Sequence, residues 1–415
     1  MKNSKLAKTF LTFAIFFNAQ IACAGLDEAQ IALRDGKYAQ AVAEFKKMAE
    51  SGNSEAEFTL GKLYESGRGV VQDFKSAVFW YQKSAQENYA PAQFSLGRCY
   101  VNGTGIGKDE SSAIYWYRKA AILGFPEAQL EYGMRLLAKP ETSNDDGGAV
   151  LWIRKSAEAK NPSAQLKMGN MYLNGEVFEK NPVLAALWFR RAAELDMADA
   201  QFQLAKLYES GLGTEQSLSQ AYSWYLKAAL NGNAAAQSHV SQMLLLGQGV
   251  EKNEKDGIAW LYKAADQGEP EAEFQLARMY DSGALIEQDF SQAFFWYRKA
   301  ADQGHAGAES GLAALYAHGR GVAADEKLAF SWYKKSAEQA NTKAQYNLGW
   351  LYANGLGTQA DIVSAYIWFN LAASSGDEDA IKNRKLAESM LTSAQLEKAQ
   401  TMTNEWVVKF KQLAR

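Results

Sequence analysis

The chain has 415 residues, 47% of them hydrophobic, with 44 basic and 47 acidic side chains and a formal net charge of −3. This near balance lacks the basic excess of a nucleic-acid-binding protein, and no run of Lys and Arg suggests a patch for an anionic membrane. The 33 glycines greatly outnumber the 6 prolines, so a largely helical fold is not excluded.

The first 24 residues have the layout of a secretory signal peptide. Three lysines in the first eight positions precede an apolar stretch at 10–17, and Ala22-Cys23-Ala24 offers small residues for cleavage. The apolar stretch is too short to span a bilayer, and no later apolar run is long enough for a membrane helix. We therefore expect residues 1–24 to be a signal peptide cleaved after Ala24, and the mature protein to be periplasmic or secreted.

A lipoprotein acylated on Cys23 is the alternative for this segment. Gln20 stands where a lipoprotein signal usually has an aliphatic residue, which favours ordinary cleavage. After that cleavage Cys99 is the single cysteine of the mature chain, so an internal disulfide is excluded.

From residue 53 onwards the sequence is an uninterrupted internal repeat of 36 residues. Its clearest marker is a tryptophan that recurs nine times at this period: Trp80, Trp116, Trp152, Trp188, Trp224, Trp260, Trp296, Trp332 and Trp368. A fixed period of this length is the signature of a repeat architecture. We expect nine repeats over residues 53–376, preceded by a helix pair without the tryptophan at 25–52.

Both halves of a repeat have helical spacing. In the second repeat Ala92, Leu96 and Tyr100 recur every four residues, and Gly97 lies among them. This places them on one helical face, where the small residue admits a neighbouring helix. The second half repeats the pattern around its tryptophan. Each repeat is therefore predicted to be a helix pair, and the fold class is all-α.

The ends of the second helices are also marked. Residues whose side chains accept hydrogen bonds at a helix start precede every one of them, namely Asp73, Asp109, Asp145, Asn181, Ser217, Asn253, Asp289, Asp325 and Asp361. Gly124 and its equivalents follow, where a left-handed backbone ends the helix. Within a repeat, Gly-x-Gly, as at Gly103 and Gly105, marks the turn between the two helices.

These motifs resemble the Sel1-like repeat, a relative of the tetratricopeptide repeat. The second repeat carries the resemblance as Ala-x-x-x-Leu-Gly-x-x-Tyr-x-x-Gly-x-Gly over residues 92–105, followed by Ala113, Trp116, Tyr117, Lys119, Ala120 and Ala121. The resemblance implies an α/α superhelical solenoid with capping helices at both ends. Residues 377–411 are similar to the closing segment of this family, with a last helix beginning near Leu391, and we expect C-terminal capping helices over 377–415. The repeat at 126–161 departs from the pattern, because Arg135 occupies a slot that is leucine elsewhere.

Residues suited to catalysis or metal binding are scarce. His305 and His318 flank one predicted helix at about 20 Å from each other, too far apart to share a metal. Cys99 stands in the phase of core leucines, which favours a buried thiol over a nucleophile. The repeated Gly-x-Gly closes a helix instead of opening one, so it is a cap and not a phosphate loop. We expect no enzyme activity, cofactor or metal.

Charged side chains on the first helices come in pairs three residues apart, Lys62 with Glu65, Lys206 with Glu209 and Arg278 with Asp281. We interpret them as surface ion pairs. The basic residues of these pairs stand at one position of the repeat, which is polar in most repeats. In the last repeat Trp350 occupies that position.

An exposed aromatic residue with small neighbours is typical of an interface anchor. We therefore assign Trp350, Tyr346, Arg278 and Lys206 as candidate partner-binding residues. The alternative for Trp350 is that the closing helices after residue 377 cover it.

The resemblance implies a scaffold or adaptor that binds other proteins in a concave groove. Similar secreted proteins of Gram-negative bacteria serve the cell envelope, so we expect envelope or peptidoglycan-related enzymes among the partners. An alternative is β-lactam binding or hydrolysis, known among cysteine-rich relatives, but those carry a cysteine pair in each repeat and this chain does not. An adaptor of the endoplasmic reticulum is a third reading, which the bacterial-type signal disfavours.

Overall fold

The structure is a computed structural model that describes residues 26–138 and 148–413, and within these ranges all regular secondary structure is helical. The expected signal peptide, Cys23 and the cap residue Asp145 lie outside the described residues. Residues 26–34 and α2 (Tyr38–Glu50) form the helix pair that precedes the repeats.

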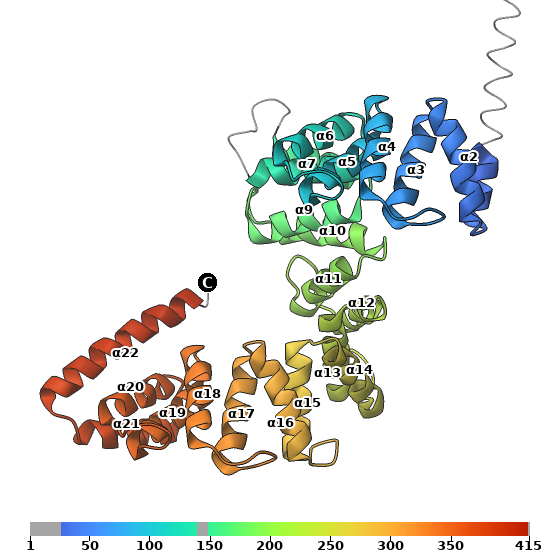
Figure 1. The fold of residues 1–415 in the computed structure, drawn as a ribbon. Coiled ribbons are helices and arrows are strands. Elements are labelled where there is room, and N and C mark those ends of the chain that lie inside the picture. The colour runs from blue at the N-terminus through green and yellow to red at the C-terminus, as the bar shows by residue number, and fades with distance from the viewer. Residues whose placement is uncertain (1–25, 139–147, 414–415) are drawn as a thin grey trace, which may run out of the picture. The chain divides into compact units, whose positions relative to one another are not determined.

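Each repeat contributes two helices (Figure 1). The first helices of the repeats are α3 (Ser54–Ser66), α5 (Ala90–Asn102), α7 (Pro126–Ala138), α9 (Pro162–Asn174), α11 (Ala198–Ser210), α13 (Ala234–Leu246), α15 (Pro270–Ser282), α17 (Ala306–His318) and α19 (Thr342–Asn354). The second helices are α4 (Phe74–Gln86), α6 (Glu110–Ile122), α8 (Ala149–Glu158), α10 (Pro182–Ala193), α12 (Leu218–Leu230), α14 (Glu254–Asp266), α16 (Phe290–Asp302), α18 (Glu326–Glu338) and α20 (Ile362–Ala373). Two closing helices follow, α21 (Glu378–Ser389) and α22 (Ser393–Leu413).

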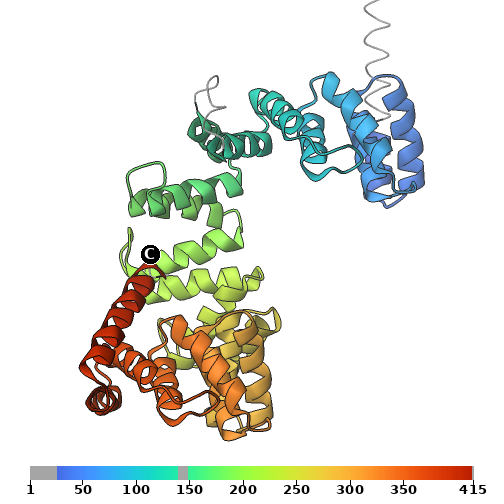
Figure 2. The same ribbon diagram turned by 60° about the vertical axis from the view of Figure 1, so that its left-hand side comes forward.

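From α2 to α10 and from α12 to α21, consecutive helices pack against each other, which confirms the predicted α/α solenoid. The small residue of each first helix makes this packing possible: a Cβ on Gly97 would lie 2.7 Å from the ring of Tyr117 in the following second helix. The chain divides into two compact units, residues 1–200 and 201–415, and the division falls inside α11. In both views successive helices of the second unit, such as α15 to α18, stack side by side (Figures 1 and 2).

The two ends of the repeat array are covered by their neighbouring helices. Phe45 of α2 belongs to the same buried cluster as Leu60 and Trp80 of the first repeat. At the other end the ring of Trp406 on α22 lies 5.0 Å from that of Trp368 on α20. Both contacts bury an apolar face that the terminal repeats would otherwise expose.

The predicted helix ends are present wherever the structure describes them. The Asp109 side chain accepts hydrogen bonds from the backbone N–H groups of Ser111 and Ser112, and seven of its eight equivalents do the same at their own helix starts. Gly103 and Gly105 have φ angles of 73° and 72°. A Cβ on Gly105 would also lie 2.1 Å from the carbonyl oxygen of Phe74, so this position needs glycine for two reasons.

The repeated tryptophans belong to the core, as their phase predicts. Six are buried, and Trp116, Trp224 and Trp260 are half-buried. A Lys or Arg three residues further on lies over the ring in eight of the nine repeats; in the sixth, the Nζ of Lys263 is 4.0 Å from the ring centroid of Trp260. A cation in this position is attracted by the ring face while its aliphatic stem covers the indole.

A row of buried polar side chains connects the repeats. This row was not predicted from the sequence. Every repeat has a buried Gln or Glu directly after the alanine that corresponds to Ala92: Glu57, Gln93, Gln129, Gln165, Gln201, Gln237, Glu273, Glu309 and Gln345. Gln237 makes two hydrogen bonds. Its amide donates to the carbonyl of Ala229, in the preceding helix, at 3.1 Å, and its side-chain oxygen accepts from Gln267 at 2.7 Å. The row thus supplies hydrogen bonds at buried helix ends.

Candidate functional site

The candidate residues Lys206, Arg278 and Trp350 occupy the same position in alternate repeats, on α11, α15 and α19 of the second unit. All three are exposed, and Trp350 has 46% of its surface accessible. The structure therefore places these side chains on one type of surface, the exposed side of the first helices, without bringing them into contact in a single cluster.

Trp350 and Tyr346 lie one turn apart on α19 but have different surroundings. Tyr346 is half-buried: its ring packs on Phe369 at 5.8 Å, and its hydroxyl accepts a hydrogen bond from Asn383 of α21 at 3.2 Å. Of the two closing helices, α21 thus contacts Tyr346, whereas Trp350 remains exposed. The expected alternative, in which those helices cover Trp350, does not occur among the described residues.

The prediction of ion pairs within the first helices is wrong. The carboxylates of Glu65 and Glu209 instead accept hydrogen bonds of 2.6 Å from the hydroxyls of Tyr81 and Tyr225 in the following second helices. The cations lie over phenylalanine rings of their own helices, with Lys62, Lys206 and Arg278 at 5.6, 5.7 and 5.7 Å from the rings of Phe58, Phe202 and Phe274. A phenylalanine one turn earlier is the sequence signal that could have predicted this arrangement.

In the first and fifth repeats a basic side chain from the next first helix completes the arrangement. Arg98 on α5 lies 3.5 Å from Glu65. His239 on α13 lies 4.0 Å from Glu209 and stacks on the ring of Tyr225 with 4.6 Å between centroids. Burial lowers the pKa of His239, so the imidazole interacts chiefly as a neutral aromatic ring at neutral pH.

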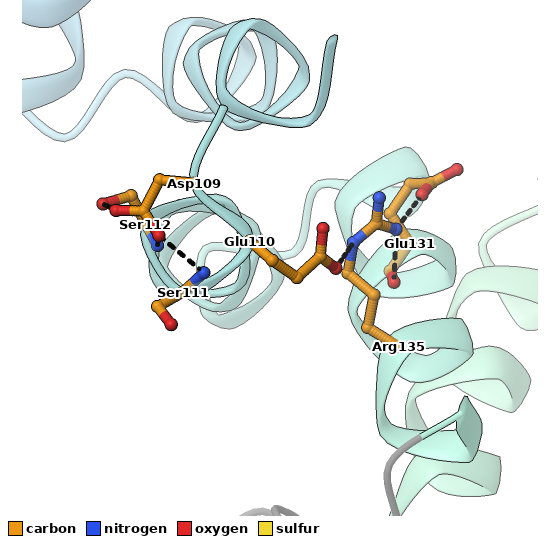
Figure 3. Close-up of polar contacts among 6 residues, drawn as sticks. All are labelled: Asp109, Glu110, Ser111, Ser112, Glu131 and Arg135. Carbon is orange, nitrogen blue, oxygen red and sulfur yellow. Dashed lines mark hydrogen bonds and ion pairs between the residues drawn. The ribbon is translucent and has the colours of Figure 1, made fainter. Parts of the chain in front are cut away.

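Arg135 extends this pattern to the junction between the second and third repeats (Figure 3). Its guanidinium lies 4.7 Å from the ring centroid of Tyr117 and forms ion pairs with Glu131 of its own helix and, at 3.0 Å, with Glu110 at the start of α6. The charge in a leucine slot is therefore neutralised by two carboxylates and an aromatic face.

In the seventh repeat Asp281 and Tyr297 take the places of the glutamate and the tyrosine. A pocket lies where the first and fifth repeats have the basic side chain. The pocket has a volume of about 590 Å³ and is lined by residues of α15, of α17 and of the helices that follow them, among them Phe274, Arg278, Asp281, Tyr297, Gly311 and Ala314. Gly311 of α17 stands at the position of His239 in α13, and Ala314 stands at the position of Arg98 in α5. The pocket exists because these two residues are small. Asp281 accepts from the Tyr297 hydroxyl at 3.3 Å, since its side chain is one methylene shorter than glutamate.

A second pocket of about 400 Å³ adjoins this region and contains Leu245, Leu261 and Glu271. Arg278 lines both pockets. Among the candidate residues, Arg278 therefore has two cavities beside its side chain. From the sequence, Asp281 was interpreted only as the ion-pair partner of Arg278 and not as part of a binding site.

The histidines and the cysteine have structural surroundings. His305 caps α17, because its Nδ1 accepts from the backbone N–H of Ala308 at 3.1 Å while its Nε2 lies 3.1 Å from Glu271. Cys99 is buried, as its phase predicts, and burial raises its thiol pKa to about 11. Within residues 26–138 and 148–413, no three His, Cys, Asp or Glu side chains are grouped as a metal site would require.

A family model describes the same periodicity. The Sel1 repeat model matches residues 54–89, 90–125, 162–197, 198–233, 234–269, 270–305, 306–341 and 342–377. The chain belongs to the Sel1 repeat family. Residues 126–161, between the second and third matches, form the helix pair α7 and α8 and contain Arg135.

Two solved structures are similar to this Sel1 repeat chain over most of its length. One is c5321, a protective antigen present in uropathogenic Escherichia coli strains, with 29% identity, a TM-score of 0.50, and coverage of 89% of this chain and 95% of that one. The other is a Sel1 repeat protein from Oxalobacter formigenes, with 33% identity, a TM-score of 0.56, and coverage of 74% and 89%. No curated protein matches the chain.

Sel1 repeat proteins generally mediate contacts between proteins. Among the described residues, no helix combines the length and the apolar composition needed to cross a membrane.

Proposed function

We propose that this Sel1 repeat protein is a scaffold of the bacterial cell envelope that binds partner proteins on the exposed side of its first helices. The observation that carries the proposal is Trp350, a large aromatic side chain left 46% exposed on α19. Aromatic anchors of this kind contribute a large part of the binding energy in protein interfaces.

Two further features support binding on the second unit. Arg278 presents a guanidinium between two pockets, and arginine is enriched in interfaces together with tryptophan. A solenoid built from short helix pairs also offers a long surface that individual substitutions can adapt to a partner. The proposed partners are envelope proteins, including enzymes that act on peptidoglycan.

Export to the periplasm or the cell exterior belongs to the same proposal. It is supported by the signal-like residues 1–24, and one relative is a protective antigen, which agrees with a location outside the cytoplasm. N-terminal sequencing of the protein from its native host should begin at Gly25. A mature chain that begins with an acylated Cys23 would instead indicate a lipoprotein, and an intact Met1 in the cytosol would contradict export.

Site-specific photo-crosslinking tests the binding surface. A photoreactive amino acid at position 350 should crosslink a discrete partner in living cells of the native host. Position 295 on the second helix α16 is the matched control, because Phe295 is 48% exposed. Crosslinking to the same proteins from both positions would contradict a binding surface on the first helices.

Substitution of the anchor gives an independent measurement. Because Trp350 is half exposed, Trp350→Ala should lower the melting temperature by no more than a few degrees, corresponding to about 1 kcal/mol. The same variant should capture at least tenfold less of the crosslinked partner, since removal of an anchor costs about 2 kcal/mol or more of binding. Unchanged capture would exclude Trp350 from the interface.

A further inference from the structure

The pocket between α15 and α17 lies where other repeats place a basic side chain of their own. In the first repeat Arg98 approaches Glu65, which also accepts from Tyr81. In the fifth repeat His239 occupies the equivalent space beside Glu209 and Tyr225. The seventh repeat retains the acceptor and the ring as Asp281 and Tyr297, but the following helix provides only small residues.

The equivalence is one of register. Ala314 follows Asp281 by the same 33 residues by which Arg98 follows Glu65. Gly311 likewise corresponds to His239, and a Cβ on Gly311 would lie 2.6 Å from the Tyr297 ring. The ring therefore lies directly against α17, and the space that a longer side chain would fill is open to solvent.

We propose that this pocket binds an arginine side chain of a partner protein, with the guanidinium on the Asp281 carboxylate and against the Tyr297 ring. The inference rests on the proposed scaffold function, because it assigns the chemistry of the partner at one point of that surface. Arg135 shows the same combination within this chain: its guanidinium lies over the Tyr117 ring. The same guanidinium pairs with Glu110 (Figure 3). Arginine suits such a site because its planar group can stack on a ring and pair with a carboxylate at once.

Two other cations line the pocket, Arg278 and Lys343. Arg278 lies over the Phe274 ring at 5.7 Å. Lys62 has the same relation to Phe58, at 5.6 Å, in the repeat where Arg98 approaches the carboxylate. At the junction of the first and second repeats, one cation over a phenylalanine ring therefore coexists with a second cation at the carboxylate. Burial, together with the Asp281 carboxylate, raises the pKa of Tyr297, so its hydroxyl remains a donor to Asp281 and adds no negative charge that would compete with this carboxylate for the guanidinium.

Ligand-observed NMR with the mature chain tests this assignment. The probes are Nα-acetyl-arginine methylamide and its uncharged isostere, Nα-acetyl-citrulline methylamide. We expect the arginine compound to bind with a dissociation constant on the order of 1 mM, as for a small ligand with few contacts. The citrulline compound should bind about tenfold more weakly, because it loses the charge-assisted hydrogen bonds. Equal binding of the two, or stronger binding of Nα-acetyl-glutamate methylamide, would overturn the inference.

Two variants locate the binding. Asp281→Asn should abolish the preference for arginine over citrulline, whereas Asp302→Asn, which removes an exposed carboxylate outside the pocket lining, should retain it. Ala314→Arg should fill the pocket from within, as Arg98 does in the first repeat, and so prevent binding without lowering the melting temperature. Binding that survives Asp281→Asn and Ala314→Arg in folded protein would place the arginine elsewhere.

The crosslink from position 350 separates this inference from the proposed function. If that crosslink forms in cells and is unaffected by Asp281→Asn, while the arginine probe fails to bind, then the scaffold function stands and the pocket assignment is wrong. If the probe binds and no crosslink forms from position 350, the pocket assignment stands and the Trp350 surface is wrong.

Discussion

Glu273 shows how the residue type at one buried position affects the free energy of unfolding. Six repeats place glutamine here, and the first, seventh and eighth place Glu57, Glu273 and Glu309. A glutamine can donate to the carbonyl of the preceding helix and accept from the helix that follows, whereas an ionised glutamate can only accept. Burial raises the pKa of all three glutamates, so the charged form is disfavoured in the folded state.

The variant Glu273→Gln should therefore stabilise the protein at neutral pH. Because the folded pKa of Glu273 is raised, ionisation costs stability above that pKa, and the cost is removed as pH falls through it towards the unfolded value. Glutamine also regains a donor for the carbonyl of Ala265, which contributes about 1 kcal/mol. Lys299, 3.8 Å from Glu273, offsets part of this gain. Thermal unfolding should show a higher melting temperature at pH 7 and a difference that shrinks towards pH 4.

The control for this comparison is Glu287→Gln, which changes an exposed glutamate. This substitution should change the melting temperature and its pH dependence less than Glu273→Gln does. A lower melting temperature of Glu273→Gln at pH 7 would mean that the Lys299 pair outweighs desolvation.

At the scale of the helix, the sequence predicted where the helices begin and end. It predicted only some of the residues that each helix buries. Asp109 and Gly103 mark helix ends by chemistry that is local to the backbone, so their roles follow from the residue type. The buried glutamines were missed because a polar residue next to an apolar stripe usually faces solvent. Arg135 was recognised as a departure, but its partners Glu110 and Tyr117 belong to another helix, and no local pattern identifies them.

Gly105 allows the helix-level packing to be tested. Gly105→Ala adds the strain of a side chain at φ 72° and a clash with the carbonyl of Phe74 in the preceding repeat. Gly124→Ala adds only the strain at φ 85°, because nothing lies within 4 Å of its Cβ. We expect Gly124→Ala to cost about 1 kcal/mol and Gly105→Ala about 1–3 kcal/mol more.

Denaturant unfolding, with hydrogen exchange across α4 to α6, measures both variants. Equal destabilisation by the two substitutions would mean that the contact between Gly105 and the start of α4 contributes nothing beyond the backbone conformation.

At the scale of the whole molecule, the period of 36 residues predicted the solenoid, but the candidate site depends on differences between repeats. The pocket arises from the combination of Asp281, Gly311 and Ala314 in adjacent repeats. Each of these residues is ordinary in its own helix. Whether small residues let the helices close up or leave a cavity depends on how the surroundings relax, which residue types alone do not determine.

The buried clusters predict how damage should spread along the chain. Trp296 belongs to a cluster that extends from Leu261 to the closing helices within the second unit. Trp188 belongs to a smaller cluster with Ile153 and Met168. In a solenoid a repeat contacts only its neighbours, so the loss of one side chain should loosen the adjacent helices first.

We therefore expect Trp296→Ala and Trp188→Ala to have separate footprints in hydrogen exchange. Each buried tryptophan should contribute about 3–5 kcal/mol locally. Trp296→Ala should accelerate exchange in α15 to α18 and leave α3 to α6 unchanged, whereas Trp188→Ala should accelerate exchange in α8 to α10 and leave α17 to α20 unchanged. The measurement is mass spectrometry of both variants under native conditions, where local opening can be resolved from global unfolding. If either substitution accelerates exchange equally along the described chain, the repeats unfold as one cooperative body, and stability cannot be assigned to contacts between neighbouring repeats.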